Sequence, residues 1–188
     1  MTTSKSAGKL VIVKDKFQQY KYYRTEKPGE FDRTIFNPFL TPNEMLKLGV
    51  FEGKYLNDCK SEFPSSLFKN AKISDTPDTS LNFFGIKSRL PLHEWESKGW
   101  VHPDDPRGWF QWYCRYYYGR RHPDDERQIK RWRAFNRHAA QVKINAIKQN
   151  RLGDLSFRPK QRQGLLQWSH NFLPEIPERR ARKIIEDS

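Results

Sequence analysis

Cysteine is scarce in this sequence, and the short motifs of the commonest catalytic and metal chemistries are missing. The two cysteines, Cys59 and Cys114, exclude a disulfide-rich scaffold and a cysteine-rich zinc site. No His-x-x-His or Glu-x-x-His spacing supports a closed metal centre, and there is no glycine-rich phosphate loop. No serine or cysteine nucleophile motif is present either. Cys114 lies among aromatic residues, so we expect it to be a small buried hydrophobic residue.

Long apolar runs are also lacking. No stretch approaches the ~18 apolar residues that a membrane-spanning helix needs. The N-terminal residues MTTSKSAGK are polar and lack the apolar centre of a signal peptide. We therefore expect an intracellular protein of the cytoplasm, nucleus or a virion, which is not secreted and has no membrane partner.

Acidic residues are few in the second half of the chain, and basic residues are many. The whole chain has 35 Lys and Arg against 22 Asp and Glu, which gives a net charge of +13. Residues 107–162 alone hold 15 basic and 4 acidic residues, or +11. Charge clustered in this way predicts a polyanionic partner, nucleic acid ahead of an anionic membrane. The alternative is a basic surface that serves only to keep the protein dissolved.

Proline, glycine and capping signals predict a mainly α fold. We expect one compact helical domain over residues 9–175, with short extended or β segments near the N-terminus. Residues 1–8 are predicted to be a flexible tail, and residues 176–188 a charged helix or tail. Thr41 and Glu44 form a capping box around Pro42. The other main helices are expected over residues 91–98, 106–118, 123–150, 159–172 and 178–186.

The sequence His-Pro-Asp-Asp occurs at residues 102–105 and again at 122–125. Paired carboxylates could act as an acid/base pair, or could bind Mg²⁺ or Mn²⁺ if they converge. The favoured alternative is that each segment begins a helix, where acids meet the positive end of the dipole. We therefore predict no metal and no cofactor unless the pairs converge. The candidate catalytic residues are Asp104, Asp105, Asp124, Asp125, His122 and His138.

The next helix, residues 108–118, is apolar nearly all round and is predicted to lie in the core. Arg115 is the exception, because a charge there must meet a carboxylate, a ring face or a bound anion. Near the helix end, Tyr117 and Tyr118 are candidates for stacking on bases, with packing in the core as the alternative. Arg120 and Arg121 in the following turn could bind a phosphate, form a network with the aspartates, or do both.

Basic residues recur at helical spacing along residues 123–150, and again at 158–162. Such a stripe can follow a phosphate backbone, although an exposed charged face is the ordinary alternative. Positive charge in the first turn of a helix is opposed by the helix dipole, so a phosphate or a carboxylate should compensate it. The candidate phosphate contacts in these two segments are Lys130, Arg133, Arg137, Arg158, Lys160 and Arg162.

The block DPRGWFQWYCRYY at residues 105–117, with GRR at 119–121, resembles an uncharacterised group of hypothetical proteins. The resemblance spans roughly residues 35–170 and implies no activity, so it assigns no catalytic residue. On the residues alone, we predict a DNA- or RNA-binding protein that uses cationic helix faces and an aromatic and arginine-rich turn. One alternative is an enzyme that acts on nucleic acid or a nucleotide through an Asp, His and Arg site. Another is a structural or assembly protein whose basic face meets an acidic partner protein.

Overall fold

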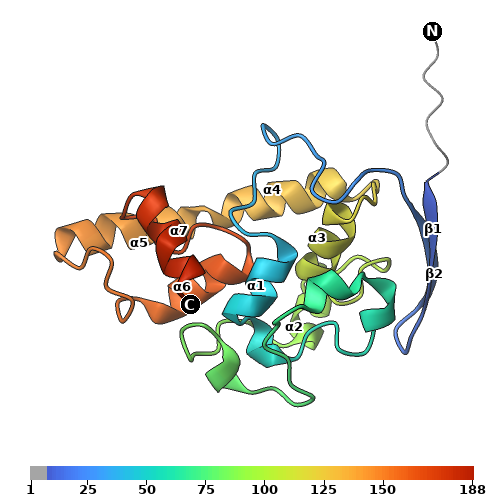
Figure 1. Cartoon of the computed structure of the whole chain (residues 1–188), viewed down its shortest axis with the longest axis horizontal. Helices are drawn as coiled ribbons and strands as arrows, with labels where there is room; N and C mark the ends of the chain where they lie inside the picture. Colours follow the sequence, from blue (N-terminus) through green and yellow to red (C-terminus); the bar gives the residue numbers. More distant parts are fainter. Residues whose placement is uncertain (1–7) are drawn as a thin grey trace, which may run out of the picture.

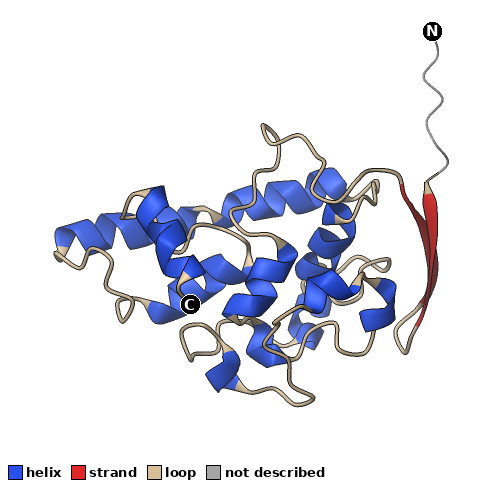
Figure 2. Cartoon of the chain, viewed as in Figure 1, coloured by secondary structure: helices blue, strands red, loops and turns tan. Residues whose placement is uncertain are grey.

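The chain folds as a helical body with one small β-hairpin, in a computed structural model that describes residues 8–188 (Figures 1 and 2). The strands are β1 (Lys9–Lys14) and β2 (Gln19–Arg24), and the α-helices are α1 (Pro42–Leu48), α2 (Leu92–Ser97), α3 (Trp109–Tyr117), α4 (Asp125–Phe135), α5 (Arg137–Lys148), α6 (Pro159–Gln167) and α7 (Glu178–Glu186). Short 3₁₀ turns are η1 (Phe51–Gly53), η2 (Lys60–Glu62), η3 (Ser65–Phe68) and η4 (Thr79–Leu81). The predicted mainly α fold is confirmed. The predicted flexible tail lies, except for Gly8, outside the described residues.

The hairpin of β1 and β2 has one covered and one open face. Val13 and Tyr22 are buried, whereas Leu10 and Ile12 point to solvent. Figure 1 shows this hairpin at one end of the long axis of the molecule, with the tip of α5 at the other end. The first strand follows the predicted apolar run. In β2 the covered Tyr20 and Tyr22 alternate with the exposed Lys21 and Tyr23, as in a strand with one covered face.

Helix α3 lies at the centre of the core. Its residues from Trp109 to Tyr116 are all buried, which the aromatic stripe predicts. The ring of Phe36 packs edge-on against the rings of Trp112 and Tyr113, with centroids 5.6 and 5.5 Å away. The segment before α1, which forms turns, therefore places an aromatic side chain in the core.

Two local predictions are confirmed in detail. The Thr41 hydroxyl accepts a hydrogen bond of 3.2 Å from the Glu44 backbone N–H, and the Glu44 carboxylate accepts one of 2.6 Å from the Thr41 N–H. These are the two reciprocal bonds of a capping box, and they fix the start of α1. Cys114 is fully buried in the core, as its aromatic surroundings indicate.

The helix predicted over residues 123–150 is interrupted at Asn136, between α4 and α5. The Asn136 backbone N–H donates to the Arg133 carbonyl at 3.1 Å, not to the carbonyl of Trp132. That carbonyl instead accepts a hydrogen bond of 2.8 Å from Nε2 of the buried His170. Because Asn136 keeps right-handed helical angles, φ −61° and ψ −17°, α4 and α5 run on along the same side of the molecule (Figure 1).

Two predicted helices are shorter in the structure than in the prediction. Helix α3 begins at Trp109, because Gly108 has a φ of 85° that a right-handed helix cannot contain. Helix α6 ends at Gln167, where the chain turns before the predicted end at Phe172.

The predicted C-terminal helix forms as α7 and packs on the rest of the molecule. Its Ala181 and Ile185 are buried and belong to the main hydrophobic cluster. Arg182 of α7 also pairs with Glu44 at 3.5 Å, whereas the other charged side chains of the helix are exposed, so the helix is a part of the domain rather than a free tail.

Candidate functional site

The two His-Pro-Asp-Asp segments fold into the same turn. In each segment, Nδ1 of the histidine accepts a hydrogen bond of 3.1 Å from the backbone N–H two residues later, from Asp104 to His102 and from Asp124 to His122. The histidine carbonyl also accepts a hydrogen bond from the N–H three residues later, at 2.9 and 3.0 Å. The repeat is therefore one turn used twice, and only the second copy leads directly into a helix, α4.

The four aspartates of the repeat do not converge on one site. Their side-chain partners are His122 for Asp104, Arg115 and Arg120 for Asp105, Arg127 for Asp124, and the Trp112 indole N–H for Asp125. Each carboxylate is thus committed to a different positive or donor group. The condition for a Mg²⁺ or Mn²⁺ site built from these pairs, or for an acid/base pair of aspartates, is not met.

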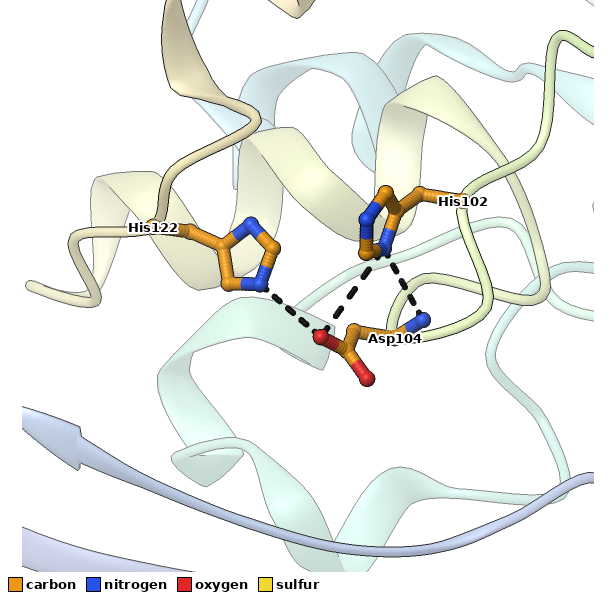
Figure 3. A group of neighbouring side chains, drawn as sticks. All are labelled: His102, Asp104 and His122. Carbon is orange, nitrogen blue, oxygen red and sulfur yellow. Dashed lines mark hydrogen bonds and ion pairs between the residues drawn. The ribbon is translucent and has the colours of Figure 1, made fainter.

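One histidine from each turn lies beside Asp104 (Figure 3). Nε2 of His122 is 2.9 Å from Oδ2 of Asp104, and Nδ1 of His102 is 3.8 Å from the same oxygen. The three possible ligand atoms lie within 4.8 Å of one another, so these residues could be considered for a metal ion. However, both Nδ1 atoms accept backbone N–H groups, which assigns the ring proton of each neutral histidine to Nε2. His122 then donates to Asp104 and has no free lone pair for a metal, so the three residues form a hydrogen-bonded link between the two turns.

His138 makes none of the contacts of that group. It lies on α5, where Nδ1 is 3.2 Å from the Gln161 amide nitrogen and the ring centroid is 4.6 Å from that of Phe135. Burial, and then the charge of Arg137, lower the pKa of His138 below its usual range. The candidate catalytic histidines His122 and His138 are therefore in separate surroundings.

Arg115 and Arg120 are buried in an ion network with Glu62 and Asp105. Arg115 donates to the Glu62 carboxylate at 2.6 and 2.9 Å and to Asp105 at 3.1 Å. Arg120 donates to the other oxygen of Asp105 at 2.6 Å. Burial lowers the pKa of Arg115, but the hydrogen bonds and charges of Glu62 and Asp105 outweigh it and raise that pKa. The prediction that these arginines contact nucleic acid is wrong, because they are 0% and 1% exposed and are neutralised within the fold.

Other predicted contacts are also buried. Arg162 is 0% exposed and forms an ion pair of 2.8 Å with Glu175, so the compensating negative charge for it is a carboxylate. Tyr118 is buried too, which removes it as a stacking ring. Tyr117 is half-buried, and its ring lies edge-on to Phe31 at 6.3 Å.

Arg121 holds a turn together rather than facing outward. Its guanidinium donates to the backbone carbonyls of Tyr116 and Glu30 at 3.0 and 2.6 Å. The same group lies 4.2 Å from the centroid of the Tyr116 ring. These contacts tie the end of α3 to the segment that follows β2.

The surface of α4, α5 and the start of α6 is rich in cations, and only some of them have a carboxylate partner among residues 8–188. Between Glu126 and Asp154 the sequence has no acidic residue, and its basic residues there are Arg127, Lys130, Arg131, Arg133, Arg137, Lys143, Lys148 and Arg151. Some of these pair with acids, namely Arg127 with Asp124, Lys130 with Glu126 and Arg151 with Asp154. Four of the predicted phosphate contacts on these helices are exposed or partly exposed and have no carboxylate partner among residues 8–188. They are Arg133, Arg137, Arg158 and Lys160.

A cleft of about 530 Å³ opens beside this surface. Its aromatic lining includes Trp95, Trp100, Trp109, Phe135 and Trp168, and its cationic lining is Arg89, Arg131, Arg137 and Lys160. We call it the aromatic cleft. In the described part of the chain, no aspartate or glutamate lines it. Of its cations, Arg89 is neutralised by the buried Glu52 at 2.6 Å. The sequence carries no local signal for the aromatic cleft, because its walls come from distant parts of the chain, including residues 88–90, α2 and the turn after it, and helices α3 to α6.

Arg131 is a cation of the aromatic cleft whose hydrogen-bond partners are all neutral. It is half-buried and donates to the Trp100 carbonyl at 2.7 Å and to the Gln128 side chain at 2.9 Å, both neutral groups. Its guanidinium carbon lies 5.4 Å from the Trp168 ring and 5.9 Å from the Trp100 ring. Burial, and then the charge of Arg127, lower the pKa of Arg131 to about 10. The positive charge is thus held in a partly desolvated place where an anion would stabilise it.

The chain was compared with protein families, curated sequences and solved structures, and no family model, no curated protein and no solved structure matches it. The resemblance of residues 105–117 to a group of hypothetical proteins therefore stays a prediction. Among residues 8–188, no helix combines the length and the apolar character needed to cross a membrane.

Proposed function

We propose that this protein binds nucleic acid, and that Arg133, Arg137, Arg158 and Lys160 hold its phosphates. The observation that supports this best is the arrangement of cations without carboxylate partners beside a cleft that is aromatic and free of carboxylates. A second hollow, lined by Arg158, Lys160 and His138, shares Lys160 with the aromatic cleft. A phosphate backbone that runs over the aromatic cleft and the second hollow would supply negative charge to these four cations, which have no carboxylate partner among residues 8–188.

The observations favour nucleic acid over the other two hypotheses. An enzyme centre needs acids and histidines that act on one substrate, but the aspartates are divided among separate partners and His138 stands apart from His122. An acidic partner protein would match the cations, but it would not account for the tryptophan rings beside them. Phosphates joined to planar bases match both features.

The salt dependence of binding tests the proposal. We expect a labelled oligonucleotide to bind with a log–log salt slope of about −3, because each phosphate neutralised on a single strand contributes roughly −0.7 and four cations are involved. Affinity should then fall roughly 50-fold between about 50 and 200 mM salt. The assay is fluorescence anisotropy with single- and double-stranded DNA and RNA, and with polyglutamate as the acidic-protein control. Binding to polyglutamate but to none of the nucleic acids would select the acidic partner, and nucleic-acid binding that is flat with salt would refute the phosphate contacts.

A further inference from the structure

We infer that the aromatic cleft binds a single unstacked nucleotide, with the base on its tryptophan rings and the phosphate on Arg131, Arg137 and Lys160. This inference deepens the proposed function, because it assigns the class of ligand that enters the site: a free nucleotide end or a looped-out base, not a paired duplex. The two share Arg137 and Lys160, but only the inference places a base on a ring of the aromatic cleft and a phosphate on Arg131.

Most rings of the aromatic cleft pack against one another, and one ring is exposed to solvent. Trp168 lies between two other rings, stacked on Phe135 at 5.0 Å with an interplanar angle of 11°, and 4.8 Å from Trp109. Because these rings are already packed against one another, less conformational entropy is lost when a ligand binds beside them. Trp100, on the turn after α2, is 39% exposed and is the ring most accessible to a base. A planar base gains stacking energy on the exposed ring of Trp100, whatever the sequence of the nucleic acid.

The positive charges that line the aromatic cleft favour an anionic ligand over a neutral one. A neutral aromatic molecule would fit the rings, but it would leave Arg131 half-buried with only neutral partners. Arg137 and Lys160 stand on the same lining and are exposed, with no carboxylate partner among residues 8–188. A phosphate placed between them would accept charge-assisted hydrogen bonds, which are stronger than those between neutral groups.

The size of the aromatic cleft suits one nucleotide. Its volume of about 530 Å³ falls within the ~300–1,000 Å³ usual for pockets that enclose a small molecule. A base pair within a duplex cannot enter, because its faces are covered by neighbouring pairs and unstacking them is costly. The aromatic cleft therefore favours single strands, free ends and loops over continuous duplex.

Tryptophan fluorescence gives a direct readout, because four of the six tryptophans, Trp95, Trp100, Trp109 and Trp168, line the aromatic cleft. The full chain is titrated with adenosine 5′-monophosphate, uridine 5′-monophosphate and adenosine. We expect both nucleotides to quench the fluorescence saturably, and adenosine, which lacks the phosphate, to bind at least tenfold more weakly. Quenching by adenosine as strong as by its monophosphate would overturn the role of the cations.

Two variants with a matched control locate the binding. Arg131→Gln and Trp100→Ala should each weaken binding of the monophosphate roughly tenfold or more. The first removes a charge-assisted hydrogen bond to the phosphate, and the second removes one stacked base, which is worth about a factor of ten in affinity. Lys130→Gln removes the same charge one residue away on α4, where Lys130 already pairs with Glu126, and should leave the affinity within about twofold. Equal losses in Lys130→Gln and Arg131→Gln would show that only the overall charge matters and would overturn the inference.

The inference and the proposed function fail in different ways. Salt-dependent binding of oligonucleotides without tryptophan quenching, and unaffected by Trp100→Ala, would retain the proposed function and refute the nucleotide site. Quenching by nucleotides with no binding of any oligonucleotide would retain the site and refute the proposed function. If neither nucleotide quenching nor oligonucleotide binding is observed, the nucleotide site and the proposed function are both refuted. The variants are compared only if they keep the wild-type circular dichroism spectrum.

Discussion

Removal of one buried carboxylate should destabilise this fold severely. Asp105 is fully buried and is shared by two buried arginines, Arg115 at 3.1 Å and Arg120 at 2.6 Å. Arg115 keeps Glu62 when Asp105 is lost, but within residues 8–188 no other carboxylate pairs with Arg120. In addition, two further nitrogens of Arg120 already lack a hydrogen-bond partner among the described residues. The substitution Asp105→Asn keeps the size of the side chain and leaves one buried positive charge uncompensated.

The expected cost of Asp105→Asn is about 3–5 kcal/mol of unfolding free energy, the usual cost of breaking a buried ion pair from one side. Since 1 kcal/mol shifts the melting temperature of a chain of this size by about 2–4 °C, the variant should melt roughly 6–20 °C lower. Urea denaturation followed by circular dichroism measures the free energy. The control is Glu126→Gln, which breaks the exposed pair with Lys130, whose side chains are 80% and 70% exposed, and should leave the denaturation midpoint unchanged.

If Asp105→Asn lowers the free energy of unfolding by less than about 1 kcal/mol, as for an exposed ion pair, the buried pair does not stabilise the fold as expected. That result would mean that water or a rearranged Glu62 reaches Arg120 in the folded protein. A large loss in Glu126→Gln would equally contradict the expectation, because burial is what separates the two pairs.

Two further predictions concern stability. Burial lowers the pKa of His170 to about 4 from an ordinary 6.5, so its neutral form is favoured in the folded state. The contribution of His170 to the free energy of unfolding should be fully present above pH 6.5 and should fall by roughly 3 kcal/mol as the pH drops towards 4, because the unfolded chain takes up the proton first. In His170→Asn the urea midpoint should lose this part of its acid dependence. An unchanged pH profile in that variant would contradict the prediction. Gly119 has a φ of 99°, and a β-carbon added there would overlap the Glu26 carbonyl oxygen, whereas one added at Gly85, at φ 60°, meets nothing within 4 Å. Thermal denaturation should therefore show a much larger loss for Gly119→Ala than for Gly85→Ala, which costs only the roughly 1 kcal/mol of a strained backbone; equal losses would contradict the close approach.

Much of the helical fold can be predicted from local signals in the sequence. Thr41, Pro42 and Glu44 define the start of α1 through contacts within four residues, and the aromatic spacing of α3 defines a buried helix. The interruption at Asn136 could not be predicted, because the Trp132 carbonyl is bound there by His170, 38 residues further along the chain. A local pattern carries no information about such a distant donor.

The candidate site shows the same division between local and distant contacts. The sequence predicts that Arg115 must meet an anion, but not that the anion is Glu62, which lies 53 residues away. It also predicts a cationic α4 and α5, and burial then separates Arg115, Arg120 and Arg162 from the cations that stay on the surface. The aromatic cleft depends on tertiary packing of Trp100, Arg131 and Trp168, so no spacing in the sequence could reveal it.

The most direct test of nucleic-acid binding compares two charge reversals of equal size. Arg133→Glu with Arg137→Glu alters the proposed surface, and Arg179→Glu with Arg180→Glu makes the same change on the exposed side of α7. At about 100 mM salt, the first pair should weaken oligonucleotide binding by roughly tenfold or more, because two phosphate contacts become repulsive. The second pair should change it by no more than about twofold to threefold, through the net charge alone. Equal effects of the two pairs, or no binding by the wild-type chain, would contradict the proposed function.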